Sequence, residues 1–213
     1  ALMISMDVNH NEIADFINAK NANNKLEECN ISVRADSAFM TKVIEGDKAA
    51  TELMHTLAQN NWNWGEPGML FWDNINKETL LSEYIKKGEF EFAGVNPCAE
   101  ETLPAGGSCL LGALNLSEFV TDPLGKKPAF NLPEFKKAVK IAIRALNDVL
   151  DEGLELHPLE EQRKSVSEWR QIGLGIMGFG DMLIKLRIPY GSERCIKLIN
   201  TIGKALVNTG LQE

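Results

Sequence analysis

Short apolar runs alternate with segments of helical periodicity in the first third of the chain. Runs of strand length lie at 1–6, 29–33 and 69–72, and the segments between them place apolar residues three or four positions apart. Strands that are joined through a helix can pair in parallel, whereas a tight turn joins only antiparallel strands. The pattern therefore predicts an α/β fold with mainly parallel strands.

The second half of the chain shows the same alternation with longer helices. An apolar run at 109–116 precedes an amphipathic helix from Leu132 to near Gly153, and a further helix is expected from about Leu159. Four glycines in the apolar run 172–180 predict a strand or a helix start packed close to other backbone. Their spacing is not GxGxxG, so a dinucleotide site is not predicted there.

Composition excludes several classes of protein. The 213 residues are 44% hydrophobic and 24% charged, which is enough apolar material to bury a core. A net charge of -8 argues against binding to nucleic acid through phosphates. No apolar run reaches the roughly 18 residues of a membrane span, and residues 1–7 lack a signal-peptide pattern. We therefore expect a soluble, cytoplasmic protein with no nucleic-acid or membrane partner.

Both ends of the chain suggest a longer protein. The sequence starts directly in the apolar run 1–6 and stops inside a helical pattern at 196–213, without a Gly or Pro stop signal. We expect the chain to be a fragment.

The four cysteines are too sparse for a disulfide scaffold. Cys29, Cys98, Cys109 and Cys195 form no CxxC pair, and the three histidines lie far from them in sequence. No zinc or other metal site is therefore expected.

Candidate chemistry lies in a Gly- and Pro-punctuated segment at 90–107, which is too apolar for a surface linker and is predicted to be an ordered loop held inside the protein. If this loop is extended, Asn96, Cys98 and Glu100 face one ligand together. The thiol could be a nucleophile, a metal ligand, a hydrogen-atom carrier or an inert packing group, and the residue types alone do not decide. A structural disulfide with Cys109 is disfavoured inside a cell unless the pair is redox-active.

The wider sequence resembles the large, catalytic subunits of ribonucleotide reductases. The resemblance is closest in the finger-loop region, at 96–100, 103–104, 106–109 and 111–116. Further segments resemble the family in family order and cover nearly the whole chain: 2–7 with Ile13 and Phe16, 30–33 with 39–40, 64–68, 172–178 and 190–192.

This resemblance implies a fold. The family's catalytic domain is a ten-stranded α/β barrel of two half-barrels with a central finger loop, which would span about 94–108 here. Residues 1–213 would be a fragment of that single barrel domain, without its N- and C-terminal parts. The fragment alone is not expected to turn over substrate.

The resemblance also implies roles for four residues. Cys98 matches the cysteine whose thiyl radical removes the 3′ hydrogen of a ribonucleotide, Glu100 matches the base at the 3′ hydroxyl, and Asn96 matches the residue that orients the ribose. Cys109 matches one of two cysteines that become a disulfide during turnover, with its partner expected N-terminal to this chain. Cys29 and Cys195 are interpreted as packing residues.

Partners and cofactors follow from the same resemblance. They are a ribonucleoside diphosphate or triphosphate substrate, nucleotide effectors bound by segments outside the chain, a thioredoxin-like or other dithiol reductant, and a second copy in a homodimer. The compact spacing between Cys98 and Cys109 resembles the adenosylcobalamin-dependent branch more than the branch with a diiron or dimanganese tyrosyl-radical partner subunit. The glycyl-radical branch is disfavoured.

Two other classes stay open on the sequence. A non-catalytic regulatory homologue of the same fold would predict the loss of Asn96, Cys98 or Glu100, yet all three are present. A different cysteine-dependent enzyme would require a base such as His10, His55 or His157 beside Cys98.

Overall fold

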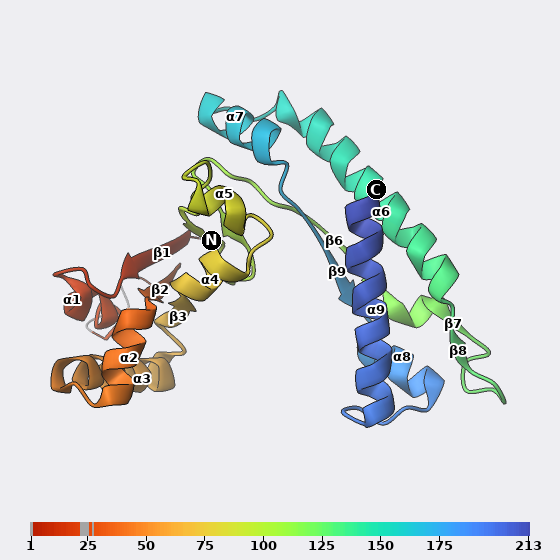
Figure 1. Cartoon of the computed structure of the whole chain (residues 1–213), viewed down its shortest axis with the longest axis horizontal. Coiled ribbons are helices and arrows are strands. Elements are labelled where there is room, and N and C mark those ends of the chain that lie inside the picture. The colour runs from red at the N-terminus through yellow and green to blue at the C-terminus, as the bar shows by residue number, and fades with distance from the viewer. Residues whose placement is uncertain (1, 22–25, 27) are drawn as a thin grey trace. The chain divides into compact units, whose positions relative to one another are not determined.

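The structure, a computed structural model, describes residues 2–21, 26 and 28–213. It consists of two compact units, Ala1–Ala105 (unit 1) and Gly106–Glu213 (unit 2). Figure 1 shows unit 1 in red to yellow-green and unit 2 in green to blue.

Unit 1 is built on a three-stranded parallel sheet. Its strands are β1 (Leu2–Asp7), β2 (Cys29–Ala35) and β3 (Gly68–Phe71), in that order. Ile4 pairs with Ile31, and Val33 pairs with Met69. The predicted parallel arrangement is confirmed. The third strand ends one residue earlier than expected, because Trp72 begins a helix.

Three helices pack with the sheet to form the core of unit 1: α1 (Ile13–Ile17), α2 (Ser37–Glu45) and α3 (Lys48–Trp64). The core consists of Val8, Ile13, Ile17, Val33, Ala35, Phe39, Ala50 and Leu57. Asp36 caps α2 by accepting a hydrogen bond from the Phe39 N–H at 2.6 Å. Gly65, in the left-handed region, ends α3.

The rest of unit 1 was not predicted as regular structure. It contains α4 (Trp72–Glu78), α5 (Ser82–Lys86) and a short hairpin of β4 (Gly94–Val95) and β5 (Thr102–Leu103). Phe90 and Phe92 are buried just before this hairpin, with ring centroids 4.9 Å apart in an edge-to-face arrangement. These rings anchor the start of the hairpin in the unit.

A polar network joins the N-terminal end of β2 to the helices. Glu66 forms an ion pair with Lys20 and accepts a hydrogen bond from the buried Ile31 N–H at 3.1 Å. The buried Asn60 side chain donates to the Ile17 carbonyl at 2.9 Å. The network satisfies backbone groups that the sheet and α1 leave without partners.

Unit 2 is built on the parallel pair β6 (Leu110–Asn115) and β9 (Ile172–Met177). The other elements are the 3-10 helix η1 (Leu116–Phe119), the antiparallel pair β7 (Val120–Thr121) and β8 (Ala129–Phe130), and the helices α6 (Leu132–Leu154), α7 (Glu160–Trp169), α8 (Phe179–Leu186) and α9 (Glu193–Gln212).

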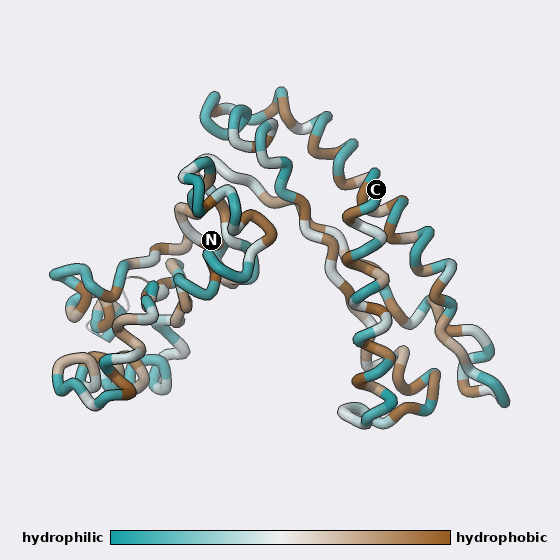
Figure 2. The backbone as a smooth tube through the Cα atoms, in the orientation of Figure 1, coloured by the Kyte–Doolittle hydropathy of each residue, from teal (hydrophilic) through white to brown (hydrophobic). Residues whose placement is uncertain are grey.

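Helix α6 confirms the amphipathic helix that the sequence predicts from Leu132 to near Gly153. Phe135, Val139 and Leu150 are buried on its inner face, and hydrophobic and hydrophilic residues alternate along it in Figure 2. The core of unit 2 also includes Leu116 and Ile202, and it joins α6, α8 and α9. Hydrophobic burial of this kind contributes about 25 cal/mol for each Å² removed from water.

The glycine-rich run forms β9 and the start of α8. Gly178 has a φ of 68° and caps α8, and a Cβ there would lie 1.9 Å from Asn115 Oδ1. Gly178 is therefore packed closely, but against the Asn115 side chain and not against the backbone that the glycine run predicted; the nearest backbone atom, Ser117 N, would lie 3.5 Å from such a Cβ.

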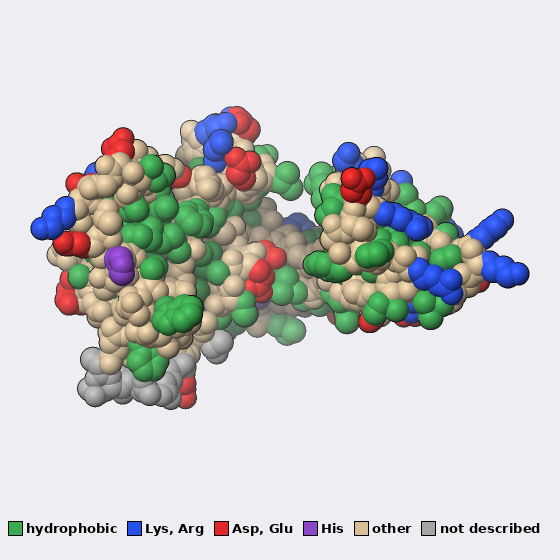
Figure 3. Space-filling view, turned by 90° about the horizontal axis from the view of Figure 1, so that it is seen from below, with side chains coloured by type: hydrophobic (Ala, Val, Ile, Leu, Met, Phe, Trp, Pro, Cys, Tyr) green, Lys and Arg blue, Asp and Glu red, His purple; other side chains and the backbone are tan. Residues whose placement is uncertain are grey.

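The β6–β9 pair has two unlike faces. Gly112 and Leu174 face α6, where Leu146 lies near Gly112, whereas Leu111 and Met177 are 54% and 56% exposed. Hydrophobic side chains occupy part of the visible surface of both units in Figure 3. Among the residues that the structure describes, no helix is both long and apolar enough to cross a membrane.

We predict that Glu66→Ala lowers the free energy of unfolding by about 2–3 kcal/mol, because it leaves the Lys20 ammonium and the Ile31 N–H without partners. Urea denaturation followed by tryptophan fluorescence would measure this, since Trp62, Trp64 and Trp72 all lie in unit 1. Lys20 and Glu66 side chains are only 14% and 22% exposed.

Glu83→Ala is the matched control, because the Glu83–Lys86 pair is 70% and 67% exposed and such pairs contribute at most about 1 kcal/mol. Equal destabilisation by the two variants would contradict a structural role for the Glu66 network.

A second prediction concerns pH. The Phe39 N–H, and then the Asn9 side-chain amide, lower the pKa of Asp36 below its ordinary 3.8. A carboxyl group with a lowered folded-state pKa stabilises the protein above its unfolded-state pKa, and this contribution is lost as pH falls through the folded-state value. Asp36→Ala should therefore cost about 1 kcal/mol at pH 7, and this difference should shrink below pH 3.8. A difference that stays constant in urea denaturations from neutral to acid pH would refute the assignment.

Candidate functional site

The predicted finger loop contains a β-hairpin. Val95 pairs with Thr102, the Ala93 N–H donates to the Leu103 carbonyl at 2.8 Å, and the Asn96 N–H donates to the Glu101 carbonyl at 3.1 Å. The pairing leaves residues 97–100 as the tip.

The tip is a tight turn rather than an extended segment. The Ala99 N–H donates to the Asn96 carbonyl at 2.9 Å, which closes a four-residue turn with Pro97 in its second position. Ala99 then adopts a φ of 64°, in the left-handed region. An extended loop is the condition for Asn96, Cys98 and Glu100 to share one face, and the turn does not meet it. Strand alternation therefore does not set the side-chain directions at 96–100.

Cys98 and Glu100 nevertheless lie together on the tip. Both are exposed in unit 1, whereas Asn96 and Pro97 are half-buried. The predicted burial of the loop holds for Phe90 and Phe92 but not for the tip. The turn presents a thiol and a carboxylate to the surroundings with one residue between them.

Asn96 has a structural function that its spacing did not indicate. Its side-chain Oδ1 accepts a hydrogen bond from the Glu101 N–H at 3.0 Å, so the side chain and the backbone of one residue both bind Glu101. The side-chain amide nitrogen has no hydrogen bond within the described part of the chain and can donate to a ligand.

Cys109 lies in unit 2, immediately before β6. Ser108 and Leu110, on either side of it, both line a cavity next to α6. Because neighbouring side chains in extended backbone point to opposite faces, Cys109 belongs with Leu111 on the open face of the β6–β9 pair.

The two remaining cysteines are buried, as expected for packing residues. Cys29 lies in β2 and Cys195 near the start of α9. The described residues include no group of three or more His, Cys, Asp or Glu placed to hold a metal ion. Within unit 1, no hydrogen bond of the described residues joins Cys98 to His10 or His55.

Comparison with known proteins gives consistent results. The family described as ribonucleotide reductase, barrel domain, matches residues 47–213. A vitamin B12-dependent ribonucleoside-diphosphate reductase of Thermoplasma acidophilum is 35% identical over 209 residues, which cover 91% of this chain and 26% of that protein. A protein of the same description from Mycobacterium tuberculosis is 31% identical, over 93% of this chain and 29% of its own length.

The fold has a counterpart among solved structures. The class Id ribonucleotide reductase alpha subunit of Actinobacillus ureae superposes with a TM-score of 0.82 at 22% identity, over 99% of this chain and 39% of that one. The chain thus spans little more than a quarter of the two curated relatives and about two fifths of this structure.

We predict that Asn96→Ala speeds amide hydrogen exchange at Glu101 about fivefold, because one hydrogen bond worth about 1 kcal/mol is lost. Asn96→Asp keeps the acceptor oxygen and should leave exchange nearly unchanged. The Ala93 amide, which is bonded to Leu103 further down the hairpin, is an internal reference. Unaltered exchange at Glu101 in Asn96→Ala would rule out the closing role.

Proposed function

The chain belongs to the ribonucleotide reductase barrel-domain family, and from this premise we propose that it is the central part of a catalytic subunit that reduces ribonucleotides to deoxyribonucleotides for DNA synthesis. The observation that supports this most directly is the hairpin tip, where Cys98 and Glu100 are exposed together and Asn96 closes the turn.

The fold is part of the barrel that defines this family. The parallel strands β1, β2, β3, β6 and β9 are the described strands that belong to this barrel. By themselves they form no closed barrel. We propose that further strands outside this chain complete the ten-stranded barrel, with the hairpin as its finger loop.

Cys98 is proposed to carry the thiyl radical. A sulfur–hydrogen bond is close in strength to the carbon–hydrogen bond of a ribose, so a thiyl radical can take the 3′ hydrogen atom and later return one. A thiol on a hairpin tip suits this task, because backbone hydrogen bonds hold the turn while the sulfur is exposed.

Glu100 and Asn96 are proposed to act on the same ribose. The Glu100 carboxylate takes the proton of the 3′ hydroxyl, which favours departure of the 2′ hydroxyl as water. The free amide N–H of Asn96 donates to a ribose oxygen, while its carbonyl oxygen keeps the turn closed.

Cys109 is proposed to supply reducing equivalents with a second thiol from outside this chain. The balance is one ribonucleotide and two thiols giving one deoxyribonucleotide, one disulfide and one water. Each turnover moves two electrons from sulfur to the substrate, so a thioredoxin-like or other dithiol must then reduce the disulfide.

The proposed source of the radical is adenosylcobalamin, as the names of both curated relatives suggest. When bound, this cofactor supplies the radical that oxidises the Cys98 thiol by one electron. The exposed thiol of the tip fits this requirement, because its sulfur is open to a group outside the unit. A metal-bearing partner subunit is the alternative source.

The setting proposed for the complete enzyme is the cytoplasm, with ribonucleotides as substrates, nucleotide effectors bound by other segments, and a homodimeric assembly. The two other classes have less support. The tip retains all three residues that a non-catalytic homologue would be free to lose. A histidine-activated thiol enzyme would need a base at Cys98, and within unit 1 no described hydrogen bond joins Cys98 to His10 or His55.

The test is deoxyribonucleotide formation by the complete polypeptide that contains this sequence, with a ribonucleoside diphosphate, a dithiol and adenosylcobalamin. Cys98→Ala should reduce product by at least about a thousandfold, and Glu100→Gln should reduce it by about 10²–10⁴-fold with binding largely retained.

Cys195→Ala is the matched control, because this thiol is buried in unit 2 and should leave turnover intact. Product that needs a metal-bearing subunit in place of cobalamin would reassign the radical source and keep Cys98. Full activity in Cys98→Ala would refute the mechanism.

A further inference from the structure

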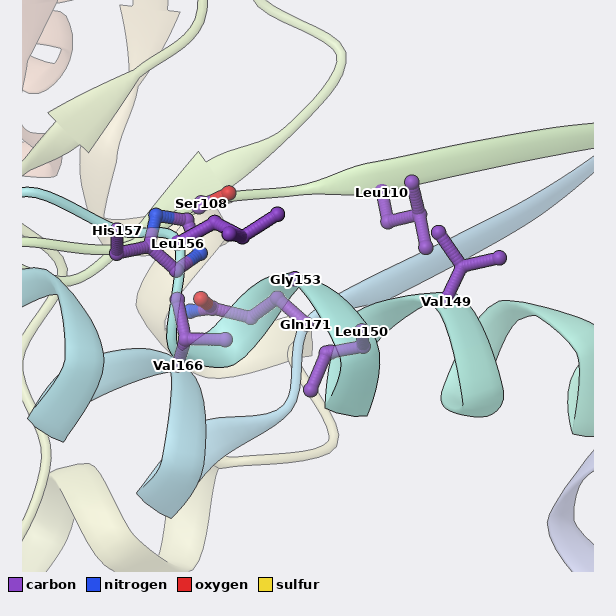
Figure 4. A pocket seen from close by; sticks show the side chains of 9 residues that line it. All are labelled: Ser108, Leu110, Val149, Leu150, Gly153, Leu156, His157, Val166 and Gln171. Atoms are coloured by element: carbon purple, nitrogen blue, oxygen red, sulfur yellow. The ribbon is translucent and has the colours of Figure 1, made fainter.

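A cavity of about 260 Å³ lies in unit 2. Figure 4 shows its walls, which come from the residues around the start of β6, the last turns of α6, and α7 with the segments on either side of it. Leu110, Leu150 and Val166 form much of its apolar wall, and Ser108, His157 and Gln171 supply the polar groups.

Gln171 is the unusual member of this set. Both polar atoms of its side-chain amide are buried, and neither has a hydrogen-bond partner among the residues described. The backbone of Gln171 is held by a strand hydrogen bond, since its carbonyl accepts from the Leu110 N–H at 3.3 Å. In Figure 4 its side chain extends from the start of β9 towards the end of the cavity where His157 lies.

A buried amide without partners lowers stability, and native proteins rarely keep one without a compensating ligand or water. A glutamine amide offers one donor group and one acceptor group in a plane. A ligand satisfies both at once only if it has its own donor beside an acceptor, as a primary carboxamide or a lactam does.

The remaining lining restricts the ligand further. No Asp, Glu, Lys or Arg lines the cavity, so no permanently charged side chain in it would compensate a full charge on the ligand. Its volume lies just below the range of pockets that hold drug-sized molecules, so it suits one ring with a small substituent.

We propose that this cavity is a binding site for a small, uncharged molecule in which a carboxamide or lactam is attached to a flat apolar ring. Gln171 pairs with the amide edge, the apolar wall covers the ring, and Ser108 and His157 offer further hydrogen bonds at one end. The site does not depend on the function proposed for the hairpin, because it includes none of the residues 96–101.

Benzamide is the first probe, titrated into the isotope-labelled 213-residue chain and followed by NMR chemical shifts. Saturable shifts should centre on the Gln171 side-chain amide and on Val166. Benzoate and acetophenone are matched in size, but benzoate is charged and acetophenone lacks a donor. Each should bind at least about tenfold more weakly, the ratio that corresponds to about one lost hydrogen bond.

Two variants test the site by different routes. Gln171→Leu removes the amide at nearly constant volume, and Gly153→Leu fills the cavity, since a Cβ at Gly153 meets no atom within 4 Å. Both should abolish the benzamide shifts, and Gly153→Leu remains informative if the first variant fails to fold. Gln59→Leu, on an exposed position of α3, should bind as the parent does.

The proposal fails if benzamide gives no saturable shifts in the parent chain, which would mean that the cavity holds water alone. It also fails if benzoate binds as well as benzamide, or if Gly153→Leu folds and retains full binding.

Discussion

Parallel strand pairing is the constraint on which both units depend. Each of β2, β3 and β9 must run in the same direction as its neighbour, so a helical crossover has to bring the chain back between strands. In unit 2 the long crossover supplies α6, which covers one face of the β6–β9 pair and leaves Leu111 and Met177 exposed on the other. A barrel gives such a face an interior to occupy, because side chains from all of its strands fill the centre. The exposed apolar face of the β6–β9 pair is therefore consistent with the barrel fold of the family, in which such a face would be covered.

The hairpin places a thiol and a carboxylate on backbone that is not part of a core. Phe90 and Phe92 anchor its base by burial, and the turn is closed by hydrogen bonds at Asn96. Neither Cys98 nor Glu100 is needed to hold the turn, since no described hydrogen bond uses either side chain. The residue types at 98 and 100 are therefore not needed to hold the turn, which the neighbouring residues stabilise.

Much of the fold follows from sequence periodicity, because long amphipathic helices such as α3 and α6 bury regular faces. Helices α4 and α5 have no buried residue, so they leave no apolar period to detect. Strand β3 ends where Trp72 begins α4, and the Trp72 ring lies under the Arg34 guanidinium at 5.1 Å, a contact between segments far apart in sequence. At the candidate site, family segments identified the residues, but the turn at Ala99 and the closing bond of Asn96 are properties of packing and backbone that spacing does not encode.

The exposed tip has a practical consequence for anyone who handles this protein. Cys29 and Cys195 are shielded by the cores of their units, whereas the Cys98 thiol is open to solvent. Exposure and thiolate character together determine which thiols oxidise, so copies of the isolated 213-residue chain kept in air can be joined through Cys98. A species of twice the mass on a non-reducing gel would then record storage history rather than quaternary structure.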